Sequence, residues 1–177
     1  MNIAEFLLPG MLSKTIQKFL DNNKIKYEIL EHKTVYTAFD KAATLRIKPQ
    51  EVGKTVVVSL DKDYSLGLIP ANKNLDKKKV LAAFNKLRAK SKEKNYKKID
   101  FAKEQWMKNN FKGVDLGATP PFGLLYKLPL FIDNALIKPS KIIINGGAYE
   151  TSIRLSPANL IKLETIILKG GFSMAKK

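Results

Sequence analysis

The chain has 177 residues, a length that predicts one domain spanning residues 1–177. Its 45% hydrophobic and 27% charged residues are typical of a soluble globular protein. Cysteine is absent and His32 is the single histidine, which excludes disulfides, thiolate metal sites and multi-histidine metal sites. We therefore expect neither a metal nor an organic cofactor. Residues 1–10 lack the basic leader of a signal peptide, and no run reaches the roughly 18 apolar residues of a membrane span. A cytoplasmic protein without a membrane partner is expected.

Basic residues outnumber acidic ones by 32 to 16, which gives a net charge of +16. More than half of this excess lies in residues 73–112, where 14 basic residues accompany 4 acidic ones. A field of this sign attracts polyanions such as nucleic acids. However, 29 of the basic residues are lysines and 3 are arginines, the better phosphate readers, so a solvated lysine surface remains an alternative.

Apolar spacing predicts both helices and strands in the first half of the chain. The expected elements are a helix at 13–22 capped by Ser13 (within a helical segment 1–24), a strand at 26–31, a helix at 37–45, a helical turn after Pro49, and a hairpin of strands 54–60 and 64–69. Residues 56–58 are all valine, which is typical of a strand covered on both faces. Period-two alternation places Lys54 on the same face as Val56 and Val58.

The second half is predicted to mix the two element types without strict alternation. The expected elements are a helix that begins at Asn74 or Asp76, a helix near 100–109, strands at 128–132, 141–145, 150–155 and 165–168, and a helix that begins at Ser156-Pro157. The first two helices make 73–112 a basic helical segment, and Phe84, Phe101 and Trp106 are expected in the core. Gly146-Gly147 is expected to break its strand. This order predicts an α+β fold with a mixed sheet.

The stretch Gly117-Ala118-Thr119-Pro120-Pro121-Phe122-Gly123 is the most distinctive loop signal in the chain. Pro120 and Pro121 lack an N–H and fix φ, so they cannot continue a helix or lie in a central strand. Glycine at each end allows backbone angles that other residues avoid. A stiff loop that holds a polar group or a water at a pocket wall is predicted, and an ordinary surface turn is the alternative.

Five blocks in chain order resemble the YbaK/prolyl-tRNA-editing family of aminoacyl-tRNA deacylases, across residues 25–168. The blocks are 27–32 with 35–38, 52–57, 117–121 with Phe122-Gly123 behind it, 131–133, and 145–147 with 151–157. Residues 117–121 match the family's Gly-x-x-x-Pro loop, and Lys54 matches its signature functional lysine. Members built into prolyl-tRNA synthetase carry a histidine after the late glycine turn. This chain has Ala-Tyr-Glu at 148–150, which argues against a histidine-dependent mechanism.

The resemblance implies a mixed, partly closed β-sheet flanked by helices. It also implies hydrolysis of the ester between a wrongly attached, small amino acid and the terminal adenosine of a tRNA. Lys54, Gly117 and Pro121 are then the candidate catalytic residues, with Lys54 holding the phosphate of that adenosine. The candidate substrate-binding residues are His32, Tyr36, Thr37, Thr55, Ala118, Thr119, Pro120, Phe122, Gly123, Asp133, Gly146 and Gly147.

An activated ester requires positioning and oriented dipoles more than a strong base. Because two loop residues are prolines, backbone donors would come from Ala118, Thr119 or Phe122. Stacking on Tyr36, Phe39 or Phe122 could hold the adenine. The size of the pocket would exclude larger amino acids.

Structural roles compete with these functional ones. Lys54 could extend from a strand end to solvent, and His32 could cap the turn between strand and helix. Asp133 could cap a short helix at 134–136. Gly146-Gly147 fits a turn better than a phosphate cradle, because no P-loop Lys-Ser/Thr follows it.

The predicted partner is aminoacyl-tRNA, with an aminoacyl-tRNA synthetase as a second candidate, and residues 73–112 could grip the tRNA. The alternative is a non-catalytic RNA-binding or synthetase-binding module on the same fold. A basic protein that visits acidic membranes is a further alternative, but no segment shows the sharp basic/apolar helical division that this would require.

Overall fold

The computed structural model describes residues 12–177, so the first eleven residues of the expected segment 1–24 lie outside the described part. Helix α1 (Lys14–Asn22) begins where the sequence predicts, because the hydroxyl of Ser13 accepts a hydrogen bond from the Ile16 N–H at 3.2 Å. Ile16 and Leu20 form the buried face of this helix. The predicted helical spacing is confirmed for this segment.

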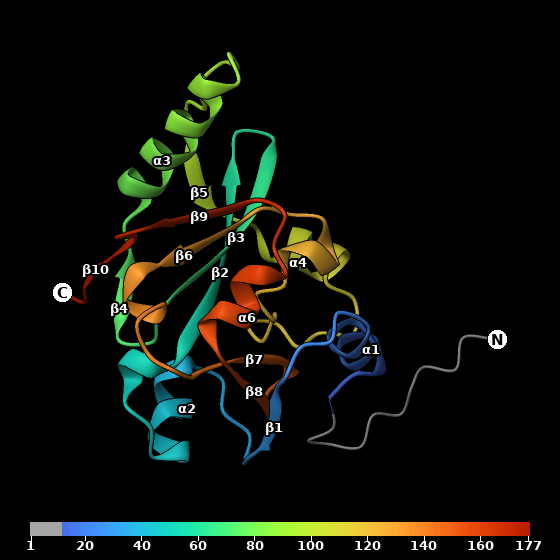
Figure 1. The fold of residues 1–177 in the computed structure, drawn as a ribbon. Helices are drawn as coiled ribbons and strands as arrows, with labels where there is room; N and C mark the ends of the chain where they lie inside the picture. The colour runs from blue at the N-terminus through green and yellow to red at the C-terminus, as the bar shows by residue number, and fades with distance from the viewer. Residues whose placement is uncertain (1–11) are drawn as a thin grey trace.

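A five-stranded mixed sheet forms the centre of the fold (Figure 1). Its order is β5 (Ile99–Phe101), β2 (Gly53–Leu60), β3 (Asp63–Pro70), β6 (Leu130–Asp133) and β9 (Ile167–Gly170). Strands β2 and β3 form the predicted antiparallel hairpin, while β6 runs parallel to both β3 and β9. The predicted α+β class with a mixed sheet and flanking helices is confirmed.

A second, antiparallel sheet has the order β1 (Glu28–Glu31), β8 (Thr151–Leu155) and β7 (Ile142–Ala148). A single parallel bridge between Val52 and Ile143 joins it to the start of β2. Figure 1 shows this sheet below the five-stranded sheet, close to helix α2 (Ala38–Leu45). The junction brings the beginning of β2 and the end of β7 into one neighbourhood.

Strand β2 is covered on both faces, as the valine run predicts. Val57 belongs to a core that includes Ile16 and Phe122, whereas Val58 belongs to a second core beneath helix α3 (Lys77–Lys90). Val56 packs against the second core, and this places Lys54 on the α3 side of the sheet. The remaining helices are η1 (Pro49–Glu51), α4 (Glu104–Asn110), α5 (Gly123–Tyr126), η2 (Asn134–Leu136) and α6 (Pro157–Lys162).

Phe101 departs from its prediction, since it lies in strand β5 rather than in a helix, and its side chain is 53% exposed. The free edge of β2 explains this. Val58 pairs with Phe101 there, and Val57 accepts a hydrogen bond from the Ala102 N–H at 2.9 Å. Helix α4 therefore starts only at Glu104. Phe84 is buried as expected, and Trp106 is half-buried and stacks on Tyr64.

Besides β5, two further short strands and one bulge were not predicted. Strand β4 (Lys73–Leu75) pairs with β10 (Ser173–Ala175), so residues 73–112 contain β4 and β5 as well as α3 and α4 and are not a purely helical segment. Gly146 and Gly147 do not end β7. They form an irregularity after which Ala148 pairs again with Thr151, and Gly147 takes a φ of +93° that a bulge accommodates. Within residues 12–177, each helix is too short or too polar to cross a membrane.

Candidate active site

A cavity of about 250 Å³ lies where α2, β2, the 117–123 loop and the end of β7 meet. Its volume is below that of pockets that hold drug-sized ligands, so it is suited to a small group. The cavity brings together residues that are far apart in the sequence. Six of the predicted site residues line it: Tyr36, Thr37, Lys54, Thr55, Gly117 and Ala118.

The 117–123 loop is held by the late glycine turn. The Gly147 N–H donates to the Ala118 carbonyl at 2.9 Å, and the Asp115 N–H donates to the Gly147 carbonyl at 2.8 Å. Gly117 has a φ of +85°, which glycine adopts without strain. Gly147 therefore supports the loop through its backbone.

Asn145 links the loop to a buried lysine. Its amide nitrogen donates to the carbonyls of Gly117 and Thr119, at 3.2 and 3.3 Å. Its amide oxygen accepts a 2.7 Å hydrogen bond from the Lys41 ammonium. Lys41 is 4% exposed and lines the cavity. Its burial lowers its pKa to about 8.

The sequence analysis missed both Lys41 and Asn145, although a signal existed for each. Lys41 lies three residues after Ala38 and one before Ala42, so it occupies the same face of the helix as these two alanines. A lysine at such a position must find a partner. Asn145 directly precedes the glycine turn, where an amide can reach the neighbouring loop.

Lys54 lies at the boundary between this cavity and a larger groove, because it lines both. Its ammonium donates to the Lys73 carbonyl at 2.7 Å. Burial, together with the nearby Lys176 charge, holds the pKa of the half-buried Lys54 below its usual value. The alternative role considered for Lys54 was a side chain that extends from the strand end into solvent. Its ammonium is instead held by the Lys73 carbonyl.

The backbone donors available to a ligand are fewer than expected. The Ala118 N–H donates to the Asp115 carbonyl and the Phe122 N–H donates to the Pro120 carbonyl, both at 2.9 Å. Of the three expected donors, Thr119 is therefore the one whose N–H has no partner within residues 12–177. In the same described range, the buried Thr55 hydroxyl, on the cavity wall, also has no hydrogen-bond partner.

Two tyrosines form the outer wall of the cavity. The Tyr149 hydroxyl donates to the Leu116 carbonyl at 2.7 Å, and its ring meets the Tyr36 ring edge-on, with 4.8 Å between centroids. Tyr36 is 70% exposed, so its ring is available to a base. Phe122 is not available, because its ring has no exposed surface and packs against Phe19.

Three other predicted residues have structural contacts away from the cavity wall. His32 bridges a turn, since its Nδ1 donates to the Lys33 carbonyl and its Nε2 accepts from the Ser152 hydroxyl, both at 2.8 Å. Asp133 caps η2 through the Ala135 N–H, and its second oxygen accepts from Phe172 and Ser173. The Gly123 N–H donates to the Glu164 carboxylate at 3.0 Å. Pro120 and Pro121 are buried.

Replacement of Gly147 by alanine should destabilise the loop support. The residue has a φ of +93°, and a Cβ there would lie 2.9 Å from Ile16 Cδ1. We expect a loss of about 1–2 kcal/mol in the free energy of unfolding, measured by urea denaturation. Gly171→Ala is the matched control, because a Cβ at Gly171 would meet nothing within 4 Å. Equal stability of the two variants would contradict this account.

The buried Lys41 should make stability depend on pH. Its pKa is about 8 in the folded chain against an ordinary 10.5, so between these values the unfolded chain binds more protons. The free energy of unfolding therefore gains from this group as pH rises from about 8 to 10.5, by up to about 3 kcal/mol. Denaturation of Lys41→Met across this range should lack that gain, whereas the exposed Lys48→Met should retain it. Parallel pH profiles for wild type and Lys41→Met would contradict the burial of a charged amine.

Comparison with known proteins identifies the family of the chain. A family model described as the aminoacyl-tRNA editing domain matches residues 32–163. The chain belongs to this family. The matched range includes α2, β2, the 117–123 loop and β7, which together enclose the cavity. No curated protein matches the chain.

Solved structures share the fold. A protein described as "hypothetical protein APE2540" matches with a TM-score of 0.74 and 19% identity, over 91% of this chain and all of that one. A protein described as "a putative trans-editing enzyme for prolyl tRNA synthetase" matches with a TM-score of 0.70 and 20% identity, over 93% of this chain and all of that one. At these identities the likeness shows the fold alone.

Proposed function

We propose that this chain is a trans-acting editing hydrolase that deacylates mischarged aminoacyl-tRNA in the cytoplasm. The reaction would cleave the ester between a small non-cognate amino acid and the terminal adenosine. One observation carries the proposal. Within a family of editing domains, the chain has a small cavity where the signature Lys54, the 117–123 loop and a buried Lys41 meet.

In the proposed reaction, water adds to the ester carbonyl carbon and the bond to the ribose oxygen breaks. A proton passes to the ribose oxygen, which leaves a free amino acid and an intact tRNA. Negative charge develops on the carbonyl oxygen before that bond breaks. The Lys41 ammonium, in a site from which much water is excluded, would stabilise this charge without any rearrangement.

Each cavity group has a proposed part in positioning the ester. Lys54 would hold the phosphate of the terminal adenosine as a point charge, while Tyr36 offers an exposed ring for its base. The Thr55 hydroxyl is the unengaged donor on the cavity wall for the amino acid or the attacking water. The unengaged Thr119 N–H belongs to the residue that follows Ala118 of the wall. The terminal ribose hydroxyl can assist the proton transfer, because RNA supplies a group that the protein lacks.

The cavity would select by size. At about 250 Å³ it accommodates a small amino acid and leaves no space for a large side chain. Steric exclusion supplements the limited discrimination that binding energy alone can give between similar amino acids. Gly117 and Pro121 would contribute by fixing the shape of the wall.

We further propose that the editing domain extends beyond the matched residues to the end of the chain. Strand β9 completes the five-stranded sheet, and Asp133 holds the backbone of Phe172 at 2.8 Å. An aminoacyl-tRNA synthetase is proposed as a partner that would supply mischarged tRNA. The neighbour described as "a putative trans-editing enzyme for prolyl tRNA synthetase" supports this idea by analogy.

Incubation of the wild-type chain with tRNAs carrying alanine, serine, cysteine or proline tests the proposal. We expect hydrolysis of one or two of these esters, at a rate well above that of the buffer control. Bound tRNA without hydrolysis of any ester would instead favour a non-catalytic RNA-binding module.

A further inference from the structure

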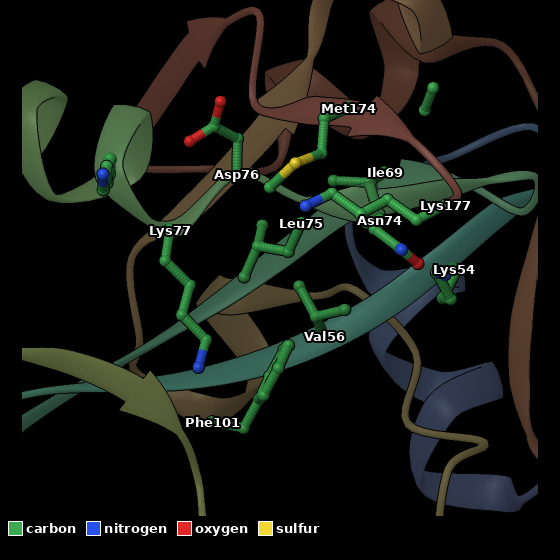
Figure 2. Close-up of a pocket in the computed structure, with 12 residues that line it drawn as sticks. Lys54, Val56, Ile69, Asn74, Leu75, Asp76, Lys77, Phe101, Met174 and Lys177 are labelled. Carbon is green, nitrogen blue, oxygen red and sulfur yellow. The ribbon is translucent and has the colours of Figure 1, made fainter.

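A groove of about 900 Å³ with a strongly basic lining lies beside the candidate active site. It lies between the start of β2, the β4–β10 pair, the start of α3 and strand β5 (Figure 2). Lys54 lines both this groove and the small cavity, so the two are adjacent. The groove is large enough for nucleotide-sized groups, whereas the small cavity is not.

The floor of the groove is apolar and one of its walls is aromatic. Val56, Ile69 and Leu75 form the floor, and Phe101 and Met174 are exposed at its sides, by 53% and 43%. Figure 2 shows the Lys77 side chain reaching toward the Phe101 ring, and its ammonium lies 4.4 Å from the ring centroid. An exposed aromatic face beside a cation is the arrangement on which single-stranded nucleic acids stack their bases.

The charge of the groove is positive. Four lysines (Lys54, Lys77, Lys78 and Lys177) and one carboxylate, that of Asp76, line it, and the Lys77 ammonium also pairs with the Asp100 carboxylate at 3.4 Å. The Asp76 carboxylate is engaged, because it caps α3 at the Lys79 N–H and lies 3.9 Å from the Lys79 ammonium. Among residues 12–177, neither Lys78 nor Lys177 has a carboxylate partner. Such a groove attracts an anion with several charges.

We propose that this groove binds the single-stranded 3′ end of the tRNA, with a base stacked on Phe101 and phosphates held by Lys77, Lys78 and Lys177. The proposal rests on the proposed function, since it places the terminal adenosine at Lys54 and the preceding nucleotides in the groove. The charge pattern favours RNA over an apolar peptide, which would leave these lysines without a counter-charge.

The groove depends on residues outside the range that matches the family. Strand β10 and Lys177, which follows it, form one wall, and they lie beyond residue 163. Strand β10 is fixed by its pairing with β4, and the Ser173 hydroxyl donates to Asp133 at 2.8 Å. The C-terminal residues therefore give this chain an RNA contact of its own.

Fluorescence anisotropy with a short single-stranded RNA that ends in CCA and carries no amino acid tests the proposal. We expect Phe101→Ala to weaken binding by roughly 10-fold, as loss of one stacked base does, and Phe101→Trp to restore it. The Lys78→Ala/Lys177→Ala variant should reduce the slope of log K against log salt by about 1.4, because two phosphate contacts are lost. The matched control is Lys90→Ala/Lys92→Ala at the far end of α3, which removes the same charge.

A duplex RNA without the 3′ overhang provides a second control, and Phe101→Ala should bind it as the wild type does. Equal affinity of the groove variants and the Lys90/Lys92 control for the single-stranded RNA would overturn the proposal.

The binding assay does not require hydrolysis, so it separates the groove assignment from the proposed hydrolysis. If the wild type deacylates and the groove variants keep its KM and affinity, only the groove assignment fails. If nothing is deacylated but Phe101→Ala loses RNA affinity, only the proposed hydrolysis fails.

Discussion

Lys54→Ala is expected to lower the rate of deacylation by at least roughly 100-fold, the effect of removing one preorganised charge from an active site. Lys54 lies where the small cavity meets the groove, and its ammonium is held by the Lys73 carbonyl at 2.7 Å. Without it, the terminal phosphate would lose the contact that places the ester in the cavity. Single-turnover hydrolysis of the aminoacyl-tRNA measures this effect.

The matched control for this variant is Lys62→Ala, which removes an exposed lysine from the turn between β2 and β3. We expect the control to hydrolyse the ester at the wild-type rate. We also expect Lys54→Ala to keep most of the affinity for uncharged tRNA, because Phe101 and the groove lysines remain. Hydrolysis by Lys54→Ala at the wild-type rate would remove Lys54 from the mechanism.

Asn145→Ala is expected to have the largest effect on stability, about 3 kcal/mol in the free energy of unfolding. The change would leave the buried Lys41 ammonium without its 2.7 Å partner and the carbonyls of Gly117 and Thr119 without their donor. Each unsatisfied buried group costs about 1–3 kcal/mol, and more when it is charged. Deacylation should fall as well, because the loop that forms the cavity wall loses its anchor.

Urea denaturation measures this loss, and Asn134→Ala is its control. Asn134 is exposed, and within residues 12–177 its side chain makes no hydrogen bond. The double variant Asn145→Ala/Lys41→Met should recover part of the lost stability, because methionine does not require a polar partner. Purely additive effects of the two substitutions would contradict a direct coupling between Lys41 and Asn145.

The central hairpin could be predicted from sequence, because its signals are local. The valine run at 56–58 indicated a strand with two buried faces, and cores lie on both sides of it. Ser13 and Asp76 cap their helices as their residue types suggest. Asp133 likewise caps η2, one of the two roles considered for it.

Other features depend on pairings between distant segments, which local patterns do not encode. Phe101 was expected in a helix, but the free edge of β2 recruits it as a strand residue. Strand β10 forms only because β4 offers it a partner. Gly146-Gly147 looked like a strand break, whereas the structure uses it as a bulge that holds the loop at Ala118.

The sequence indicated some residues of the candidate site, but it did not indicate the buried pair Lys41 and Asn145. The resemblance to the editing family pointed to Lys54 and the 117–123 loop. Lys54, Gly117 and Ala118 line the cavity, whereas residues 119–123 are not among its lining residues. The buried Lys41 escaped notice because a lysine within a short helix usually faces solvent. Its role depends on Asn145, more than a hundred residues away along the chain, and only the fold brings the two together.

The most direct measurement of the central claim is single-turnover deacylation with the wild-type chain in excess over a mischarged tRNA that carries a small amino acid. The account predicts first-order loss of the ester, faster than in buffer by at least roughly 100-fold. Loss at the buffer rate for alanine, serine, cysteine and proline esters, while anisotropy shows the tRNA bound, would contradict the account. The chain would then be a binding module on an editing fold.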